Sequence, residues 1–182
     1  MNDVFKVKTI LGMTFVLTDL GSDNPRRLPS RAFYKNSHIQ RVTIPDGFTI
    51  IGSEAFKDAC NLNFLHLPDT LQLIEQSAFT NCSSLEVLNL PDDIREIDAK
   101  AFAGCRNLFS VSIPASLTKI GHGAFSGCER LSELTIWKGL IGEEKSATYT
   151  LSRYRHVPPQ LQDLLDSAFD GCPVLRTIYT HD

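Results

Sequence analysis

The cysteines are the residues of this sequence whose type and spacing first suggest chemistry. Cys82, Cys105 and Cys128 are evenly spaced along the chain, and Cys172 follows after a longer gap. Thiols at a regular spacing could form disulfides or bind a metal ion, but no Cys-x-x-Cys pair and no Cys/His ligand spacing accompanies them. We therefore favour a column of small buried thiols that fill space or cap backbone groups over a disulfide or metal site.

A general acid and a general base could come from Glu143, Glu144 and His156, which lie in one stretch of the chain. An enzyme built around these side chains is one hypothesis. The sequence contains no phosphate-binding glycine loop, no nucleophile elbow and no zinc-protease helix. We therefore predict that the protein is not an enzyme and that it has no catalytic, cofactor-binding or metal-binding residues.

Side chains typical of recognition surfaces form another group. They belong to the segment 137–157 and comprise Trp137, Tyr149, Arg153, Tyr154 and Arg155. Trp, Tyr and Arg are the residue types favoured at interaction hot spots. The alternative is that Trp137 and the tyrosines only pack this segment onto the rest of the chain.

A sequence repeat positions these groups. The pair Ala-Phe recurs at one constant interval through five copies, and an insertion separates the fifth copy from the sixth. The copies are Ala32-Phe33, Ala55-Phe56, Ala78-Phe79, Ala101-Phe102, Ala124-Phe125 and Ala168-Phe169. Each is followed by a Leu-x-x-apolar-x-apolar pattern. A fixed period of about 23 residues with this pattern predicts a solenoid.

Each repeat predicts one coil. Alternation such as Leu88 and Leu90 against Val87 and Asn89 indicates a half-buried strand, and strands from repeats of equal length stack in a parallel sheet. A proline ends the strand in most repeats (Pro45, Pro68, Pro91, Pro114 and Pro158). An apolar-x-x-apolar step then faces inward from the opposite wall. The Ala-Phe segment is expected to be short and helical or turn-like, with its phenylalanines in one internal column.

The unit Ile-Gly-x-x-Ala-Phe-x-x-Cys-x-x-Leu, as at residues 120–131, resembles the BspA-like leucine-rich repeat family, also called the Treponema pallidum-type repeat. The resemblance covers most of the chain. It implies an α/β leucine-rich repeat solenoid of six coils of about 23 residues, with a parallel sheet on the concave face and short helical or turn segments on the convex face. It also implies a non-catalytic binding scaffold, often on microbial or protist cell surfaces, without a fixed set of binding residues.

Composition and charge exclude several other classes. With 42% hydrophobic and 21% charged residues the chain is typical of a globular protein. A net charge of −3 without a basic stripe argues against nucleic acid as a partner. No apolar run reaches the roughly 18 residues that a membrane-spanning helix needs.

The N-terminal stretch has two interpretations. Lys6 and Lys8 precede an apolar run, as in a signal peptide, but no small-x-small cleavage site follows. We expect residues 1–27 to be a capping strand or hairpin and residues 28–182 to be the solenoid, with an inserted loop at 137–157. This slightly favours an intracellular location, while a cell-surface or secreted location stays an alternative.

Recognition is expected at the positions that do not repeat. On the strands these form two outward columns, Arg41, Phe64, Val87, Ser110, Glu133, Thr177 and Thr43, His66, Asn89, Ser112, Thr135, Tyr179. The middle of the columns is small and polar (Asn89, Ser110 and Ser112), whereas larger or charged groups gather at the ends.

The predicted partner-binding residues are Arg41, Phe64, His66, Glu133, Trp137, Tyr149, Arg153, Tyr154, Arg155 and Tyr179. The first hypothesis is a scaffold that binds a protein or peptide through its concave sheet and inserted loop. The second is an adhesin-type fragment that binds surface glycan or matrix.

Overall fold

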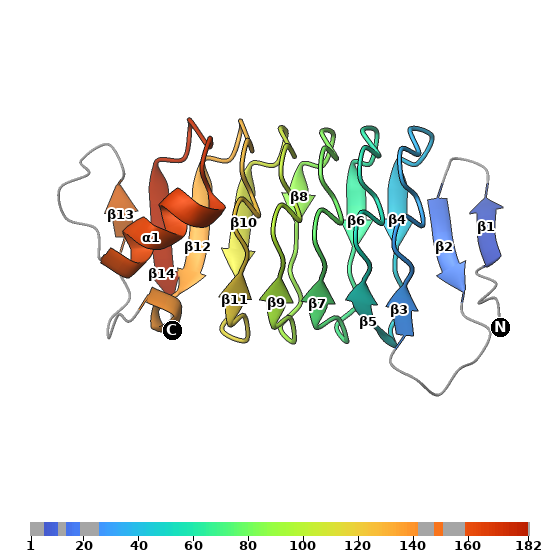
Figure 1. Cartoon of the computed structure of the whole chain (residues 1–182), viewed down its shortest axis with the longest axis horizontal. Coiled ribbons are helices and arrows are strands. Elements are labelled where there is room, and N and C mark those ends of the chain that lie inside the picture. Colours follow the sequence, from blue (N-terminus) through green and yellow to red (C-terminus); the bar gives the residue numbers. More distant parts are fainter. Residues whose placement is uncertain (1–5, 11–13, 19–25, 142–147, 151–158, 182) are drawn as a thin grey trace.

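The chain forms an elongated solenoid whose coils stack along the long axis of the molecule (Figure 1). The structure, a computed structural model, describes residues 6–10, 14–18, 26–141, 148–150 and 159–181. Coils 1 to 6 are numbered by their Ala-Phe pairs. Each of coils 1 to 5 contains two short strands joined by an Ala-Phe turn, which confirms the predicted repeat solenoid.

One strand of each coil contributes to a parallel sheet, called here the first sheet. Its strands are β4 (Arg41–Thr43), β6 (Phe64–His66), β8 (Val87–Leu88), β10 (Ser110–Ile113), β12 (Glu133–Trp137) and β14 (Thr177–His181). Residues at equivalent positions of successive repeats are partners, for example Arg41 with Phe64 and Ser110 with Glu133. Shortly after the strands of coils 1 to 4 come Pro45, Pro68, Pro91 and Pro114. Because a proline cannot donate a ladder hydrogen bond, it ends the pairing there.

A second parallel sheet lies on the wall where the sequence predicted only inward-facing apolar residues. Its strands are β3 (Arg26–Leu28), β5 (Phe48–Ile51), β7 (Leu73–Ile74), β9 (Glu96–Ile97) and β11 (Lys119–Ile120). The predicted apolar residues are buried here, as Ile74 and Ile97 are. Strands of two to four residues are too short to show a period-2 pattern, so the sequence did not reveal them as strands.

The Ala-Phe segments of coils 1 to 5 are turns, whereas the sequence left turn and helix open. The residue before Ala has positive φ in each of these coils, between 56° at Glu54 and 64° at Gly123. The residue two positions after Phe also has positive φ, as at Asn81. This backbone points the N–H of each Phe at the next coil, and the Phe79 N–H donates to the Ala101 carbonyl at 2.7 Å. The turns therefore form a third hydrogen-bonded column.

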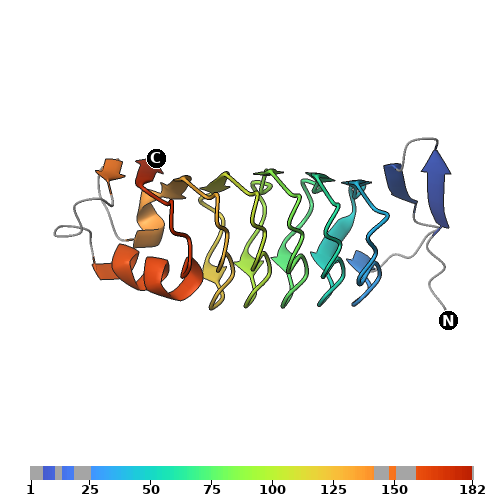
Figure 2. The same cartoon turned by 90° about the horizontal axis from the view of Figure 1, so that it is seen from above.

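Coil 6 differs because the inserted segment precedes it. The helix α1 (Pro159–Ala168) replaces the second-sheet strand and the start of the turn. Its buried side chains are Leu161, Leu165 and Ala168. In the view from above, the first-sheet strands lie along one long side of the stack and the turns along the other, with α1 at the C-terminal end (Figure 2). No described helix is long and apolar enough to cross a membrane.

The core is built from repeated residues. The six phenylalanine rings of the Ala-Phe pairs stack in one column, with centroids 5.0 to 5.3 Å apart and interplanar angles of at most 10°. This confirms the predicted internal column. Beside it the thiols of Cys82, Cys105 and Cys128 donate to phenylalanine carbonyls of the preceding coil, Cys82 to Phe56 at 3.2 Å. The predicted thiol column is confirmed.

Antiparallel strands flank the first sheet at both ends. At the N-terminal end β1 (Lys6–Ile10) pairs with β2 (Thr14–Thr18), which pairs in parallel with β4. At the C-terminal end β13 (Thr148–Thr150) pairs with β14. These strands cover edges that would otherwise be free to pair with another chain.

Candidate functional site

The outward columns of the first sheet have the predicted register over most of their length. Arg41 pairs with Phe64, Val87 with Ser110 and Glu133 with Thr177. In the other column Thr43 pairs with His66, and Thr135 with Tyr179. A repeat of constant length therefore sets side chains of different coils side by side, about 4.8 Å apart.

The ladder of the first sheet is interrupted between coils 2 and 3. Among the described strands, β6 belongs to one set that ends there and β8 begins another, and no paired residues join the two. His66 and Asn89, which the sequence placed side by side, are therefore not ladder partners. This is the single break between neighbouring coils of the described first sheet.

A hollow of about 310 Å³ lies at this break. Its walls come from β6, from the residues that follow β8 and from the two proline turns, and include Phe64, His66, Asp69, Asn89, Leu90 and Asp92. Asp69 and Asp92 are exposed and follow directly after Pro68 and Pro91. The hollow is thus lined by both apolar side chains and two carboxylates.

Exposed apolar side chains are concentrated on the first sheet. Among the described residues the large ones that remain exposed are Phe64 at 41%, Val87 at 47%, Phe109 at 45% and Tyr179 at 41%. Three belong to its strands and Phe109 directly precedes β10. The middle of the face therefore carries exposed apolar groups, Val87 in coil 3 and Phe109 in coil 4, beside the small polar side chains of Asn89, Ser110 and Ser112.

Phe109 was not predicted to face outward, because it lies outside the strict alternation. Leu108 and Val111 are both buried, so two residues between them, Phe109 and Ser110, are left facing away from the core. The signal that could have found it is the repeat itself. The equivalent positions hold Asn63, Glu86 and Ser132, all polar, so an aromatic residue there is not required by packing.

Arg41 and Phe64 form a stacked pair at the N-terminal half of the face. The guanidinium carbon of Arg41 lies 4.0 Å from the centroid of the Phe64 ring. His66 is exposed two residues further along β6. These three predicted residues therefore lie together, beside the hollow.

Glu133, Trp137 and Tyr179 lie at the C-terminal end of the face, on β12 and β14. They are three to four coils, or roughly 14 to 19 Å, from Phe64. Trp137 is half-buried, and its indole lies so close over Gly139 that a Cβ there would overlap the ring. Part of its surface therefore packs on its own chain.

Several predicted residues lie outside the described structure. Arg153, Tyr154 and Arg155 are among them, and of Tyr149 only the backbone is described, in β13 opposite Ile178. Glu143, Glu144 and His156, the residues of the enzyme hypothesis, also lie outside it. Within the described residues no group of three His, Cys, Asp or Glu side chains could hold a metal ion.

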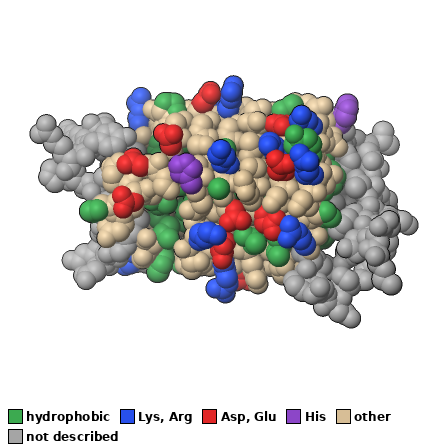
Figure 3. All heavy atoms as spheres, in the orientation of Figure 1, with side chains coloured by type: hydrophobic (Ala, Val, Ile, Leu, Met, Phe, Trp, Pro, Cys, Tyr) green, Lys and Arg blue, Asp and Glu red, His purple; other side chains and the backbone are tan. Residues whose placement is uncertain are grey.

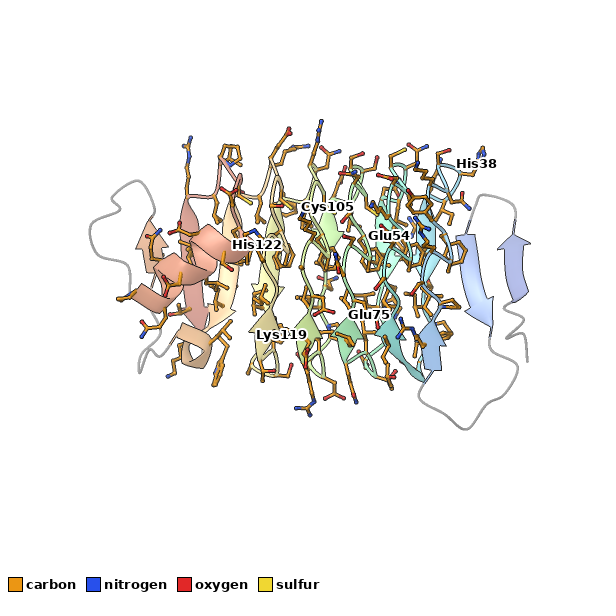
Figure 4. All side chains as sticks on the ribbon, viewed as in Figure 1. His38, Glu54, Glu75, Cys105, Lys119 and His122 are labelled. Carbon is orange, nitrogen blue, oxygen red and sulfur yellow. The ribbon has the colours of Figure 1, made fainter. Side chains whose placement is uncertain are left out.

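The face made by the Ala-Phe turns and the second sheet is charged, with acidic and basic side chains interspersed (Figure 3). Glu54, on a turn, accepts from Lys57 and from Arg31, each at 2.7 Å. Lys119, in β11, contacts Glu96 and Asp98, each at 3.1 Å. Figure 4 shows Glu54, Glu75 and Lys119 on this side. Ion pairs therefore link neighbouring coils on this face.

Ion pairing shifts the protonation of these groups. The hydrogen bond from Lys57, with the charges of Lys57 and Arg31, lowers the pKa of the Glu54 carboxyl. The hydrogen bonds to Glu96 and Asp98 raise the pKa of Lys119. In the core, burial raises the pKa of the Cys105 thiol to about 12, so this sulfur stays protonated and poorly nucleophilic near neutral pH.

Comparison with known proteins agrees with this geometry. A family model described as a BspA type leucine-rich repeat region matches residues 26–155 in six copies. The chain resembles the crystal structure of a T. pallidum leucine-rich repeat protein at 28% identity and a TM-score of 0.61, covering 72% of this chain and 68% of that one. No curated protein matches the sequence significantly.

Two further solved structures share the fold. A leucine-rich repeat protein from Bacteroides ovatus has 24% identity and a TM-score of 0.57, covering 74% of this chain and 40% of its own. The pneumococcal vaccine antigen PcpA has 20% identity and a TM-score of 0.58, covering 93% of this chain and 42% of its own. This chain thus spans about two fifths of their lengths. The extent of the family match shows that the protein belongs to the BspA-type leucine-rich repeat family.

Proposed function

We propose that this protein is a non-catalytic recognition module that binds a protein or peptide on the outward face of its first sheet. The observation that carries the proposal is the placement of the exposed apolar side chains. All four large ones among the described residues, Phe64, Val87, Phe109 and Tyr179, lie on or directly beside first-sheet strands. Exposed apolar groups gathered on one face are typical of an interaction surface.

The opposite side of the coil supports the same assignment. There the exposed side chains pair with each other between coils, as Arg27 pairs with Glu75 and Lys119 with Glu96. A surface whose charges are already paired has less to gain from a partner than one with exposed apolar groups. In this proposal the segment 137–157, which begins with Trp137, contributes to binding at the C-terminal end of the face.

A random peptide display library selected on the purified protein tests this proposal. Peptides that bind the native protein should lose binding to a variant with Phe64→Ser, Val87→Ser and Phe109→Ser. They should keep binding to a matched variant of the charged side with Arg27→Ser, Lys57→Ser and Lys119→Ser. Equal loss in both variants, or no loss in the first, would remove the first sheet as the binding face.

The inserted segment and the glycan alternative have their own readouts. Trp137→Ala with Tyr154→Ala should weaken the selected peptides if the segment takes part in binding. Saturable binding to a glycan array without any peptide enrichment would instead favour an adhesin-type fragment that recognises glycan or matrix.

A further inference from the structure

The hollow between coils 2 and 3 has a chemistry that selects its occupant. Phe64 and Leu90 supply apolar wall, and the hollow lies at the break in the first-sheet ladder. Asp69 and Asp92 occupy equivalent positions of neighbouring coils, and both line this hollow. Both are exposed at the rim, and none of the ion pairs among the described residues includes either of them.

This pair of carboxylates differs from the ion-paired acidic side chains of the charged side. Glu54, Glu75, Glu96 and Asp98 each contact a lysine or arginine on the charged side. No described lysine or arginine lines the hollow, and the guanidinium of Arg41 beside it stacks on Phe64 at 4.0 Å. Two like charges that line one hollow repel each other, so a cation placed between them gains from both.

We propose that the hollow binds the side chain of a lysine or arginine from an extended segment of a partner protein. The aliphatic part of that side chain lies against Phe64 and Leu90, and its charged head lies between Asp69 and Asp92. Long basic side chains bury their stems on apolar surface while the head stays at a polar rim, which is the combination present here. This inference rests on the proposed function and specifies the partner of the same face.

The position of Val87 adds a second requirement for the partner. Val87 is exposed at 47% and lies five residues before Asp92, at most about 17 Å away along an extended backbone. An extended partner covers this maximum distance in about five residues. The matching segment therefore carries a basic residue and an apolar residue no more than about five positions apart.

Two synthetic probe peptides test the proposal by fluorescence anisotropy. Both carry a phenylalanine in a serine- and threonine-rich background; five positions away one has an arginine and the other a glutamate. The native protein should bind the arginine probe at least about fivefold more tightly, and this preference should shrink in roughly 0.5 M salt. Asp69→Asn with Asp92→Asn should abolish the preference, whereas Asp163→Asn on the exposed side of α1 should leave it unchanged. Both aspartates are exposed, so folding is checked by thermal melting alone.

The outcomes separate this inference from the proposed function. If the two probes bind equally, and Phe64→Ser with Val87→Ser still removes binding, charge selection is overturned while the binding face stands. If neither pair of substitutions affects either probe, both proposals fail. Calcium binding by calorimetry that requires Asp69 and Asp92 would overturn the inference in favour of a metal cation.

Discussion

Arg41 and Phe64 belong to neighbouring repeats and touch, with the guanidinium carbon 4.0 Å from the ring centroid. Each occupies the same place in its coil, so the stacking of equal repeats brings them together without any local sequence signal. The same stacking places identical residues in contact inside the coil and different residues in contact outside it. Stability should therefore depend on the identical columns, and recognition on the variable ones.

Truncation within the phenylalanine column should be costly in the middle of the stack. Phe79 is fully buried between Phe56 and Phe102, with ring centroids 5.0 and 5.1 Å away. Phe79→Ala should lower the free energy of unfolding by about 3 to 5 kcal/mol, measured by urea denaturation. Phe64→Ala, at an exposed position, is the control and should cost less than about 1 kcal/mol. Equal losses would contradict the assignment of Phe79 to the core.

The turns carry backbone strain that one substitution should relieve. Lys100 has φ of 59°, a region that disfavours side chains with a Cβ, and the equivalent residue of coil 5 is Gly123. Lys100→Gly should raise the free energy of unfolding by about 1 kcal/mol, because relief of the left-handed backbone outweighs the added freedom of the unfolded chain. Lys100→Ala keeps the Cβ and should give no gain. A gain of similar size in both variants would assign the effect to the lysine side chain instead.

The ion pair on the turn side predicts a pH dependence. The pKa of Glu54 is lowered from its ordinary value of 4.5, chiefly by the hydrogen bond from Lys57. The folded state therefore holds the proton less tightly than the unfolded state, and the stabilisation is present above pH 4.5 and lost as the pH falls below it. Glu54→Gln should destabilise the protein near neutral pH and should cease to do so in acid. A difference that persists unchanged at acidic pH would show that the carboxylate charge is not its source.

Much of the fold could be predicted because the repeat exposes it. The burial of Phe56, Phe79 and Phe102 follows from their recurrence, since a residue type that recurs in every repeat of a solenoid packs against its equivalents in the core. The second sheet could not be predicted, because a strand such as Leu73–Ile74 forms from stacking on Ile50 and Ile51 and has no pattern of its own. In coil 6, where the repeat is interrupted, the helix α1 takes the place of the second-sheet strand.

The candidate surface could be predicted less completely for a related reason. The outward direction of Arg41, Phe64 and Tyr179 could be predicted because they occupy strand positions that alternate with buried residues. Phe109 was missed because two successive residues face outward there. The hollow could not be predicted, because it lies where the ladder between β6 and β8 is missing, and this is a relation between coils that no single repeat contains.

The thiol column should be chemically silent in the folded protein. Cys105 is fully buried and donates to the Phe79 carbonyl at 3.3 Å, whereas Cys60 is exposed. Iodoacetamide at mildly alkaline pH should therefore alkylate Cys60 rapidly and Cys105 only after unfolding, as peptide mass spectrometry would show. Native-state alkylation of both at similar rates would contradict the burial of the column.

Burial of the same thiol predicts an alkaline limit to stability. The pKa of Cys105 rises from its ordinary value of 9.0 to about 12, so between these values the folded state keeps a proton that the unfolded state releases. Its contribution is complete below pH 9.0 and is lost as the pH rises towards 12. Cys105→Ala cannot ionise, so the advantage of the native protein over this variant should fall steadily in urea titrations made above pH 9.0. If the advantage stayed constant across that range, the thiol would have to ionise equally in the folded and unfolded chain, and its hydrogen bond to Phe79 would not be protected from water.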